Sequence, residues 1–465
     1  MKQIAALLTL FALVSVSAAD EFVGIFLQGQ RIGYIHTVVS TTPDGKTSTL
    51  TATRIGAKVL GQGMSMAIIS KSLRKGAILE RQELTIESAG RTQNVTATYT
   101  VAEVDVTRVS GETMDKRTLQ IPVGAVVLDD PTVGLLGKGA PEPGTKLEFY
   151  ILDPMTLTLV KNEAEYLGVL PYKGVGVEGT GMKLKIVDPR ATTEIWLDKD
   201  GAMAFATGPL GMTMKPITRA EAVGSDTYMP EEDIASASRI VPDKPIENPA
   251  SIRSLSMRIK GTSLPRLTSD YYQTVERGED GIVIAVHPLE PPAMPTTIAA
   301  AGKAQPTFTR GGLNMPVDST EMKALAKQIV GAETNPYIAA QKISSHVFRI
   351  MKPNASIGVL RDAREILKTK EGVCRDYATL AATLMRSAGI PTKLVTGAVY
   401  SGDAFYYHAW VEGFVGDRWI AFDPTMGGGL ADATHIKFAE GNFEEAFITF
   451  TLDGNKIEVL KIVRK

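Results

Sequence analysis

The only cysteine of the chain, Cys374, lies in the stretch EGVCRDYATLAATLMRSAGIP, and His408 and Asp423 follow it further along. A cysteine thiolate is a nucleophile, a histidine can take up and return its proton, and a carboxylate can hold the imidazole in the useful tautomer. Together these three side chains can perform acyl transfer. Each alone has a plainer interpretation, because a lone cysteine is usually a small buried hydrophobe and an isolated strand histidine is usually structural.

The residues after Cys374 predict a helix. Apolar side chains recur at helical spacing on one continuous face, namely Tyr377, Leu380, Ala381, Leu384, Met385 and Ala388. Gly372 breaks whatever precedes the helix, and Gly389 and Pro391 end it. Cys374 therefore falls within the first turn, where unpaired backbone N–H groups and the helix dipole favour a thiolate.

His408 and Asp423 lie in the aromatic-rich segment FYYHAWVEGFVGDRWIAFDPT, residues 405–425. This segment predicts two strands joined by the Gly-Asp pair at 416–417, a favoured two-residue hairpin turn. In that register the two side chains point to one face as diagonal neighbours, with backbones roughly 7 to 8 Å apart. A one-residue bulge would put them on opposite faces, so their meeting depends on the turn.

The first residues predict an export signal. Lys2 precedes the apolar run IAALLTLFALV, and Ser17 and Ala19 suit cleavage after Ala19. We therefore expect residues 1–19 to be removed and the protein to be exported, either periplasmic or extracellular. No later segment reaches the ~20 apolar residues of a membrane span, so no stable membrane insertion is expected. One cysteine cannot form an internal disulfide, so stability must come from the packed cores.

Composition narrows the choice of partners. Lys plus Arg is 50 and Asp plus Glu is 51, which gives no electrostatic basis for binding nucleic acid or an anionic membrane. No cofactor or metal is expected either. The GVGVEG run at 174–179 precedes strand-like alternation and not the helix of a dinucleotide site, and residues 198–201 predict a hairpin turn and not a calcium loop.

The chain is long enough for several domains, and its character changes along its length. Residues 20–227 alternate in short runs and predict an antiparallel all-β domain. The proline-rich segment 228–251 predicts a linker, and residues 252–316 predict a small β-like region that ends in a second proline-rich linker. We expect residues 317–465 to form the catalytic domain, with helices, strands and a final hairpin over 443–463 whose turn is an Asp-Gly pair.

The residues around the three candidate side chains resemble the core of the transglutaminase-like superfamily, which is similar in layout to papain-type cysteine proteases. The matching residues are Gly372-Val373-Cys374, Asp376-Tyr377-Ala378, Arg386, Gly389-Ile390-Pro391, His408-Ala409-Trp410-Val411-Glu412, Trp419 and Asp423-Pro424-Thr425. The resemblance covers roughly residues 317–430 and points to an exported bacterial type.

This resemblance implies a catalytic triad of Cys374, His408 and Asp423 that acts on acyl groups, usually amides. It also implies an α+β fold in which a helix presents the cysteine to a sheet that carries the other two residues. The backbone N–H of Cys374 would help to hold the oxyanion, with a second donor from the region before the cysteine. Tyr337 is a weak candidate for that donor, because core packing explains it better.

We therefore expect an exported thiol enzyme of the cysteine protease or amidohydrolase type, acting on a protein or peptide substrate through an acyl-enzyme. Hydrolysis is favoured over transamidation, because no shield for the thioester and no acidic cluster for calcium activation can be read from the sequence. Two alternatives stay open: a transglutaminase that cross-links protein glutamine, and a catalytically silent binding or scaffold protein.

Overall fold

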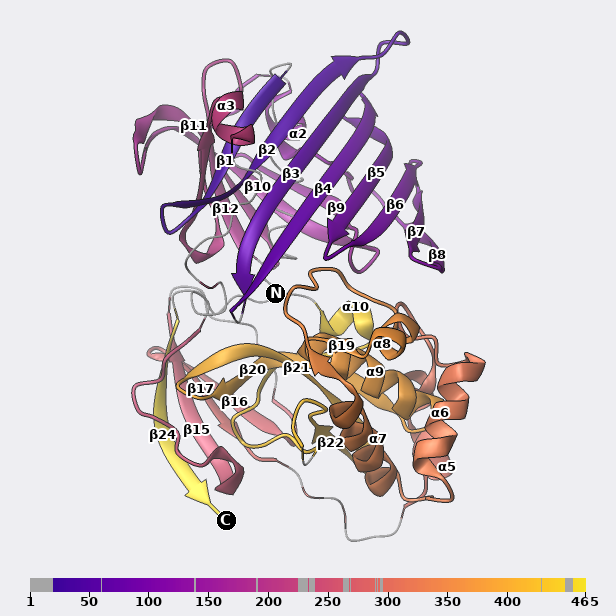
Figure 1. The fold of residues 1–465 in the computed structure, drawn as a ribbon. Helices are drawn as coiled ribbons and strands as arrows, with labels where there is room; N and C mark the ends of the chain where they lie inside the picture. The colour runs from indigo at the N-terminus through magenta and orange to yellow at the C-terminus, as the bar shows by residue number, and fades with distance from the viewer. Residues whose placement is uncertain are drawn as a thin grey trace. The chain divides into compact units, whose positions relative to one another are not determined.

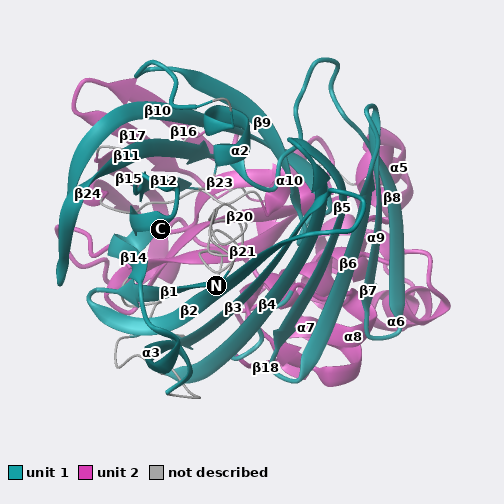
Figure 2. Ribbon diagram, turned by 90° about the horizontal axis from the view of Figure 1, so that it is seen from above, with its two compact units in different colours: residues 1–237, 355–359 teal, residues 238–354, 360–465 magenta. Residues whose placement is uncertain are grey.

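The computed structural model describes residues 20–59, 61–137, 139–189, 191–224, 233, 239–261, 267, 269–288, 290, 292, 296–427, 429–447 and 455–465. The chain forms two compact units, shown in different colours in Figure 2. Unit 1 holds residues 1–237 and 355–359, and unit 2 holds residues 238–354 and 360–465.

Unit 1 is built on one 14-stranded sheet, in which each strand pairs antiparallel with its neighbours. Figures 1 and 2 show that this sheet curves strongly. In spatial order its strands are β8 Thr113–Gln120, β7 Glu103–Ser110, β6 Arg91–Tyr99, β5 Ile78–Ser88, β4 Gln62–Lys75, β3 Thr47–Val59, β2 Gln30–Thr41, β1 Asp20–Leu27, β14 Met212–Pro216, β13 Met203–Thr207, β12 Ala191–Leu197, β11 Val177–Asp188, β10 Thr158–Gly174 and β9 Lys146–Asp153. The predicted antiparallel all-β region is confirmed.

Local sequence explains the meander. Ser88 pairs with Arg91 across a two-residue turn in which Ala89 and Gly90 both have positive φ, at 51° and 72°. Such turns match the twist of the strands that they join. The two segments that resemble a dinucleotide motif and a calcium loop are also hairpin connections. Residues 174–179 span the turn of the β10–β11 hairpin, and residues 198–201 join β12 to β13.

The described residues of unit 1 also include the short helices α2 Pro131–Leu136 and α3 Arg219–Val223 and the 3₁₀ turn η1 Pro209–Gly211. The separate segment 355–359 is held in this unit by two hydrogen bonds. The Ala355 N–H donates to Oε1 of Gln62 at 2.6 Å, and the Gly358 N–H donates to Oγ of Ser88 at 3.2 Å.

The described residues of unit 2 form two four-stranded sheets and one short parallel pair. The first sheet is β16 Gln273–Gly278, β17 Gly281–Val286, β15 Ile252–Lys260 and β24 Lys456–Arg464; the second is β22 Arg418–Phe422, β21 Ala404–Val415, β20 Thr392–Ser401 and β23 Ile436–Gly441; the pair is β18 Lys352–Pro353 and β19 Glu371–Gly372. Buried side chains of both sheets form one apolar cluster, which includes Met257 and Ile284 from the first sheet and Val395 and Trp410 from the second. The two sheets therefore pack face to face.

Helices cover the second sheet. They are α5 Ile298–Ala304, α6 Thr320–Val330, α7 Pro336–Ile350, α8 Ala363–Thr369, α9 Cys374–Ser387 and α10 Phe443–Ala446, with 3₁₀ turns η2 Pro249–Ser251 and η3 Pro306–Thr309. Helices α7 and α9 both contact β21, and Figure 1 shows them on one side of that sheet and β15 to β17 on the other. The C-terminal region is α+β, as predicted.

One predicted element is wrong. The final hairpin was expected to begin at Phe443, but Phe443–Ala446 is the helix α10, because the N–H of Asn442 donates to Oε2 of Glu445 at 2.8 Å and caps a helical turn. The second predicted strand does form, as β24, and it pairs with the distant β15. Residues 448–454, which include the expected turn, lie outside the described residues.

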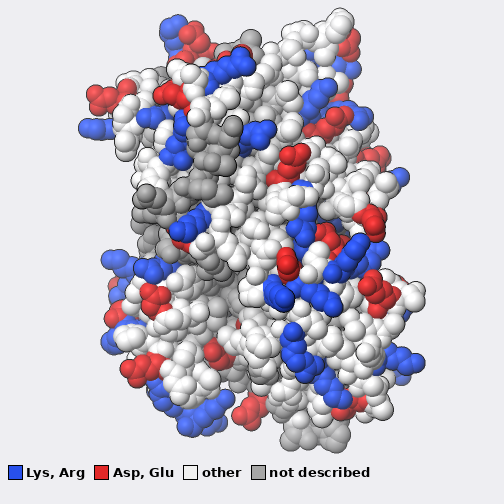
Figure 3. Space-filling view, viewed as in Figure 1, with Lys and Arg blue, Asp and Glu red and all other residues white. Residues whose placement is uncertain are grey.

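The expected export signal, residues 1–19, lies outside the described residues, and so do 228–232 and 234–238 of the expected linker. Among the helices of the described ranges, none has the length and apolar character needed to cross a membrane. Figure 3 shows side chains of both charge signs spread over the face that it draws, in keeping with the formal net charge of −1.

Candidate active site

Cys374 is the first residue of α9, so the prediction that it lies in the first turn is confirmed. Val373 before it has extended backbone angles, with φ −116° and ψ 177°. The positive end of the helix dipole lies at this N-terminus and favours an anion beside it. Cys374 is half-buried, so part of the residue is open to solvent.

A buried ion pair fixes the chain just before Cys374. The carboxylate of Asp376 accepts the Val373 N–H at 2.9 Å and lies 3.3 Å from the guanidinium of Arg361. A Cβ on Gly372 would lie 2.6 Å from Oδ2 of Asp376, so only glycine lets the backbone pass this carboxylate. The side chains of Arg361 and Asp376 are 0% and 1% exposed. The start of α9 is thus held from its own first turn and from the preceding loop.

The rest of α9 is buried, which fixes the direction of its first turn. The predicted apolar face is confirmed except at its end, because Ala388 is half-buried whereas the residues before it are buried. Helix α9 contacts β20 and β21 as well as α6, α7 and α8. The helix therefore packs between the sheet and the other helices, and this packing fixes the position of Cys374.

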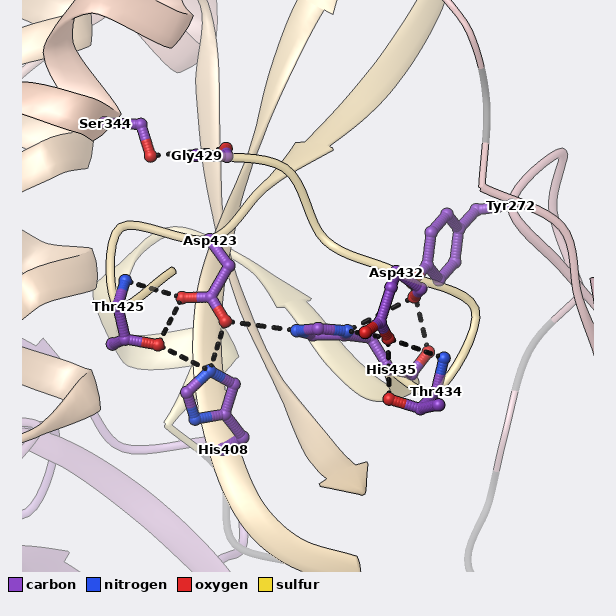
Figure 4. Close-up of polar contacts among 9 residues, drawn as sticks. All are labelled: Tyr272, Ser344, His408, Asp423, Thr425, Gly429, Asp432, Thr434 and His435. Carbon is purple, nitrogen blue, oxygen red and sulfur yellow. Dashed lines mark hydrogen bonds and ion pairs between the residues drawn. The ribbon is translucent and has the colours of Figure 1, made fainter. Parts of the chain in front are cut away.

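His408 and Asp423 come from the predicted hairpin. Val415 pairs with Arg418 across Gly416 and Asp417, so the two-residue turn and its register are confirmed. His408 lies within β21, and Asp423 is the residue that follows β22. The structure brings their side chains together, with Nε2 of His408 2.7 Å from Oδ2 of Asp423, as Figure 4 shows.

Asp423 is fully buried, and both oxygens of its carboxylate accept hydrogen bonds. Oδ1 accepts the N–H of Thr425 at 2.8 Å and its hydroxyl at 2.7 Å, while Oδ2 accepts from His408. The backbone is anchored too, because the Asp423 N–H donates to the carbonyl of Gly429, which also accepts a hydrogen bond from Ser344 on α7 (Figure 4). Burial alone would raise the pKa of Asp423, but the charge and hydrogen bonds of the neighbouring histidines lower it well below its ordinary value. Asp423 is therefore a carboxylate.

Electrostatics couples Cys374 to this pair. Burial alone would lower the pKa of His408, but the charge and hydrogen bond of Asp423, followed by the hydrogen bond and charge of Cys374, raise it to about 10. An imidazole with such a pKa is protonated at neutral pH. The arrangement suits a thiolate and imidazolium ion pair oriented by a carboxylate, and such a pair can carry out nucleophilic attack and proton transfer.

His435 belongs to none of the sequence patterns described above, yet its imidazole contacts Asp423. Its Nε2 lies 3.1 Å from Oδ2 of Asp423, the atom that also contacts His408. His435 directly precedes β23, which pairs with β20 and not with β22. No hairpin rule could therefore have placed it beside Asp423.

Two further residues lie on α7, Tyr337, the candidate for the second oxyanion donor, and His346. Tyr337 packs against Phe422 with ring centroids 5.8 Å apart, which fits the preferred interpretation as a packing residue. His346 is half-buried, and burial and the charges of Arg349 and Lys370 lower its pKa.

Metal ligation was also considered. Within the described residues, His408, Asp423 and His435 form a buried group whose potential ligand atoms lie within 4.8 Å of one another. Both imidazoles, however, aim at the same Oδ2 of Asp423, at 2.7 and 3.1 Å. These distances are those of charge-assisted hydrogen bonds to a shared acceptor.

Known proteins resemble parts of the chain. The kyphoscoliosis peptidase of Mus musculus is 34% identical over 95 residues, which are 18% of this chain and only 14% of that protein. A Cytophaga hutchinsonii protein proposed to be a cysteine protease covers 46% of this chain and 87% of its own, at 16% identity and a TM-score of 0.30. A β-barrel-like protein of a domain of unknown function from Brucella abortus covers 44% of this chain and 98% of its own, at 11% identity and a TM-score of 0.33.

The family comparison concerns the region that contains the site. The model of the transglutaminase-like superfamily matches residues 323–424, a range that includes Cys374, His408 and Asp423. The chain therefore contains a transglutaminase-like domain over residues 323–424.

Proposed function

We propose that this protein is a thiol enzyme that cleaves peptide or amide bonds through an acyl-enzyme on Cys374. The observation that carries the proposal is the buried contact of 2.7 Å between His408 and Asp423, together with the electrostatic coupling of His408 to Cys374. Loss of any one of these side chains would be expected in a catalytically silent relative, and all three are present here.

In the proposed first step, the Cys374 thiolate attacks the carbonyl carbon of the substrate and forms the C–S bond. Nε2 of His408 is engaged by Asp423, so Nδ1 is the nitrogen that carries the mobile proton. As the tetrahedral intermediate collapses, the C–N bond breaks and the imidazolium gives this proton to the leaving amine. Asp423 stays ionised and holds the ring in place.

In the second step a water molecule attacks the thioester, and His408 takes its proton. The C–S bond breaks, the carboxylic acid leaves, and the thiolate and imidazolium pair is restored. The backbone N–H of Cys374, at the start of α9, is the proposed donor to the oxyanion in both steps.

Hydrolysis is the proposed fate of the acyl-enzyme, and transfer to an amine is the alternative. The partial exposure of Cys374 supports hydrolysis, because water at ~55 M reaches an unshielded thioester. The substrate is proposed to be a protein or peptide, and the site of action is proposed to lie outside the cytoplasm, from the export signal expected at residues 1–19.

One assay distinguishes the two fates. Purified protein is incubated with a glutamine-containing protein and a fluorescent primary amine, with Cys374→Ala as the control. New peptide termini or released ammonia that depend on Cys374, without amine incorporation, are the expected result. Amine incorporation that depends on Cys374 would instead identify a transglutaminase, and a protein without either activity on a broad peptide set would support the silent alternative.

A further inference from the structure

His435 is a second histidine on the carboxylate of Asp423, and it is fully buried. Its Nε2 lies 3.1 Å from Oδ2 of Asp423, and its Nδ1 lies 3.1 Å from Oδ1 and 3.2 Å from the carbonyl oxygen of Asp432 (Figure 4). Asp432 is itself oriented by Thr434, whose N–H and hydroxyl donate to Oδ1 at 2.8 and 2.6 Å. The ring of His435 is thus fixed from both nitrogens.

The chemistry of these contacts sets the protonation state of His435. A neutral imidazole has one N–H donor and one acceptor nitrogen, whereas the imidazolium has two donors. Both nitrogens of His435 face oxygen atoms that only accept, because Asp423 and Asp432 are carboxylates. Two donors are needed, so His435 is an imidazolium between two carboxylates.

We propose that His435 is a positioning residue of the Cys374 site, which holds Oδ2 of Asp423 in place for His408 and balances the buried charge of Asp423. This inference rests on the proposed function, because a position for His408 matters only if His408 works with Cys374.

Electrostatics agrees with the geometry. Burial alone would lower the pKa of His435, but hydrogen bonds and charges from Asp423 and Asp432 raise it. The two carboxylates therefore stabilise the charged form of this buried ring.

The other groups around His435 do not replace this charge. The hydroxyl of Tyr272 donates to the carbonyl oxygens of His435 and Asp432, at 3.1 and 3.3 Å. The rings of Trp410 and His408 lie edge-on to the His435 ring, with centroids 5.1 and 5.7 Å away.

The next cation along the chain, Lys437, pairs with carboxylates other than that of Asp423. Its ammonium contacts the carboxylates of Glu412, Glu440 and Asp270, and it is itself nearly fully buried. His435 is therefore the cation that faces the second side of Asp423.

The proposal can be tested by removing the positive charge of His435. If His435 is replaced by Gln, a neutral amide can still donate to Asp423, but the positive charge is lost. The potential at Cys374 then becomes more negative, which disfavours the thiolate and raises the pH at which it forms. A residue with a purely structural role would not move this profile in a folded variant.

The experiment measures the rate of Cys374 alkylation by iodoacetamide from pH 4.5 to 9.5 in wild type, His435→Gln and the control His346→Gln. The acidic limb is expected to move up by about one pH unit in His435→Gln, which is roughly tenfold slower labelling on that limb. His346→Gln should keep the wild-type profile. A reactive wild type whose profile is unchanged in folded His435→Gln overturns this inference alone, while a wild-type thiol that is inert below pH 7 overturns the proposed function as well.

A second measurement needs no variant to fold. The protein has five histidines, so long-range ¹H–¹⁵N spectra of ¹⁵N-histidine-labelled wild type can resolve each ring. A buried ring with both nitrogens protonated at pH 8 and a contact to Asp432 is the expected result for His435. A neutral ring with one unprotonated nitrogen at pH 7 overturns the inference.

Discussion

Asp423 connects the two histidines of the site through one carboxylate. It is fully buried, and its two oxygens receive four hydrogen bonds, two from Thr425 and one each from His408 and His435. A buried carboxylate is stable only with such partners. The proposed role of this carboxylate is therefore to orient the imidazole without itself taking up a proton.

At the residue scale, we expect Asp423→Asn to lower kcat by on the order of 10²- to 10⁴-fold while leaving a measurable rate, because Asn alters the tautomer of His408 and leaves the nucleophile in place. His408→Gln should lose more, since it removes the proton carrier. Asp417→Asn, in the exposed turn of the same hairpin, is the matched control. Wild-type turnover by Asp423→Ala, in a peptide cleavage assay, would contradict the assigned role.

The pKa of His408 also predicts how stability depends on pH. Burial opposes the charge, but Asp423 and Cys374 raise the folded-state pKa to about 10, above the ~6.5 of an unfolded histidine. Because the folded value is the higher one, the stabilisation is complete below about pH 6.5 and is lost as the pH rises to about 10.

Urea unfolding of wild type and His408→Gln at several pH values measures this effect. The difference in the free energy of unfolding should shrink between pH 6.5 and 10, and the difference between wild type and His346→Gln should stay level over the same range. A His408→Gln difference that grows with pH would show that the sign is wrong.

At the element scale, helix α9 and the sheets of unit 2 decide where the site residues lie. Cys374 occupies the first position of α9, and this end of the helix is held by the buried pair of Arg361 and Asp376. Removing one partner of a buried ion pair leaves an uncompensated charge, which is far more costly than losing an exposed pair.

We therefore expect Arg361→Leu to lower the free energy of unfolding by roughly 3–5 kcal/mol and to slow labelling of Cys374. Arg364→Leu is the control, because Arg364 pairs with Asp362 but its side chain is 44% exposed, and its loss should cost less than ~1 kcal/mol. Urea titration followed by tryptophan fluorescence gives both values. Equal effects of the two substitutions would contradict the anchoring role of Arg361.

The C-terminal strand β24 allows a second test of the same kind. Val459 is 5% exposed and packs in the shared core of unit 2, whereas its neighbour Leu460 points outward and is 40% exposed. Val459→Asp should destabilise unit 2 by at least ~3 kcal/mol, and Leu460→Asp should stay within ~0.5 kcal/mol. Thermal unfolding of the two variants side by side measures the contrast, and a reversed order would show that β24 does not complete the sheet as described.

At the scale of the whole molecule, local sequence rules explain part of the site and topology explains the rest. The position of Cys374 followed from helical periodicity, and the meeting of His408 with Asp423 followed from a two-residue turn. Both are local. His435 reaches Asp423 only because β23 pairs with β20 across the intervening hairpin, and no local pattern contains that pairing.

The same contrast between local patterns and pairing of distant segments holds for the fold. The antiparallel strands of unit 1 could be predicted because neighbours in the sequence are mostly neighbours in the sheet. The pairing of β24 with β15 joins residues about 200 positions apart, and it was missed because alternation predicts a strand but not its partner. The helix α10 was missed for a different reason, since a capping contact at Asn442 outweighed the alternating pattern.

The central claim, that Cys374 is an activated nucleophile, is tested most directly by the labelling of this single thiol. Native protein is treated with iodoacetamide at pH 6 and at pH 8.5, and alkylation of Cys374 is followed by mass spectrometry in wild type and in His408→Gln. We predict rapid labelling of wild type at pH 6 and labelling of His408→Gln only near the ~8.5 of an ordinary thiol. A wild-type thiol that reacts no faster than that of His408→Gln at pH 6, or that reacts only after denaturation, would contradict the claim.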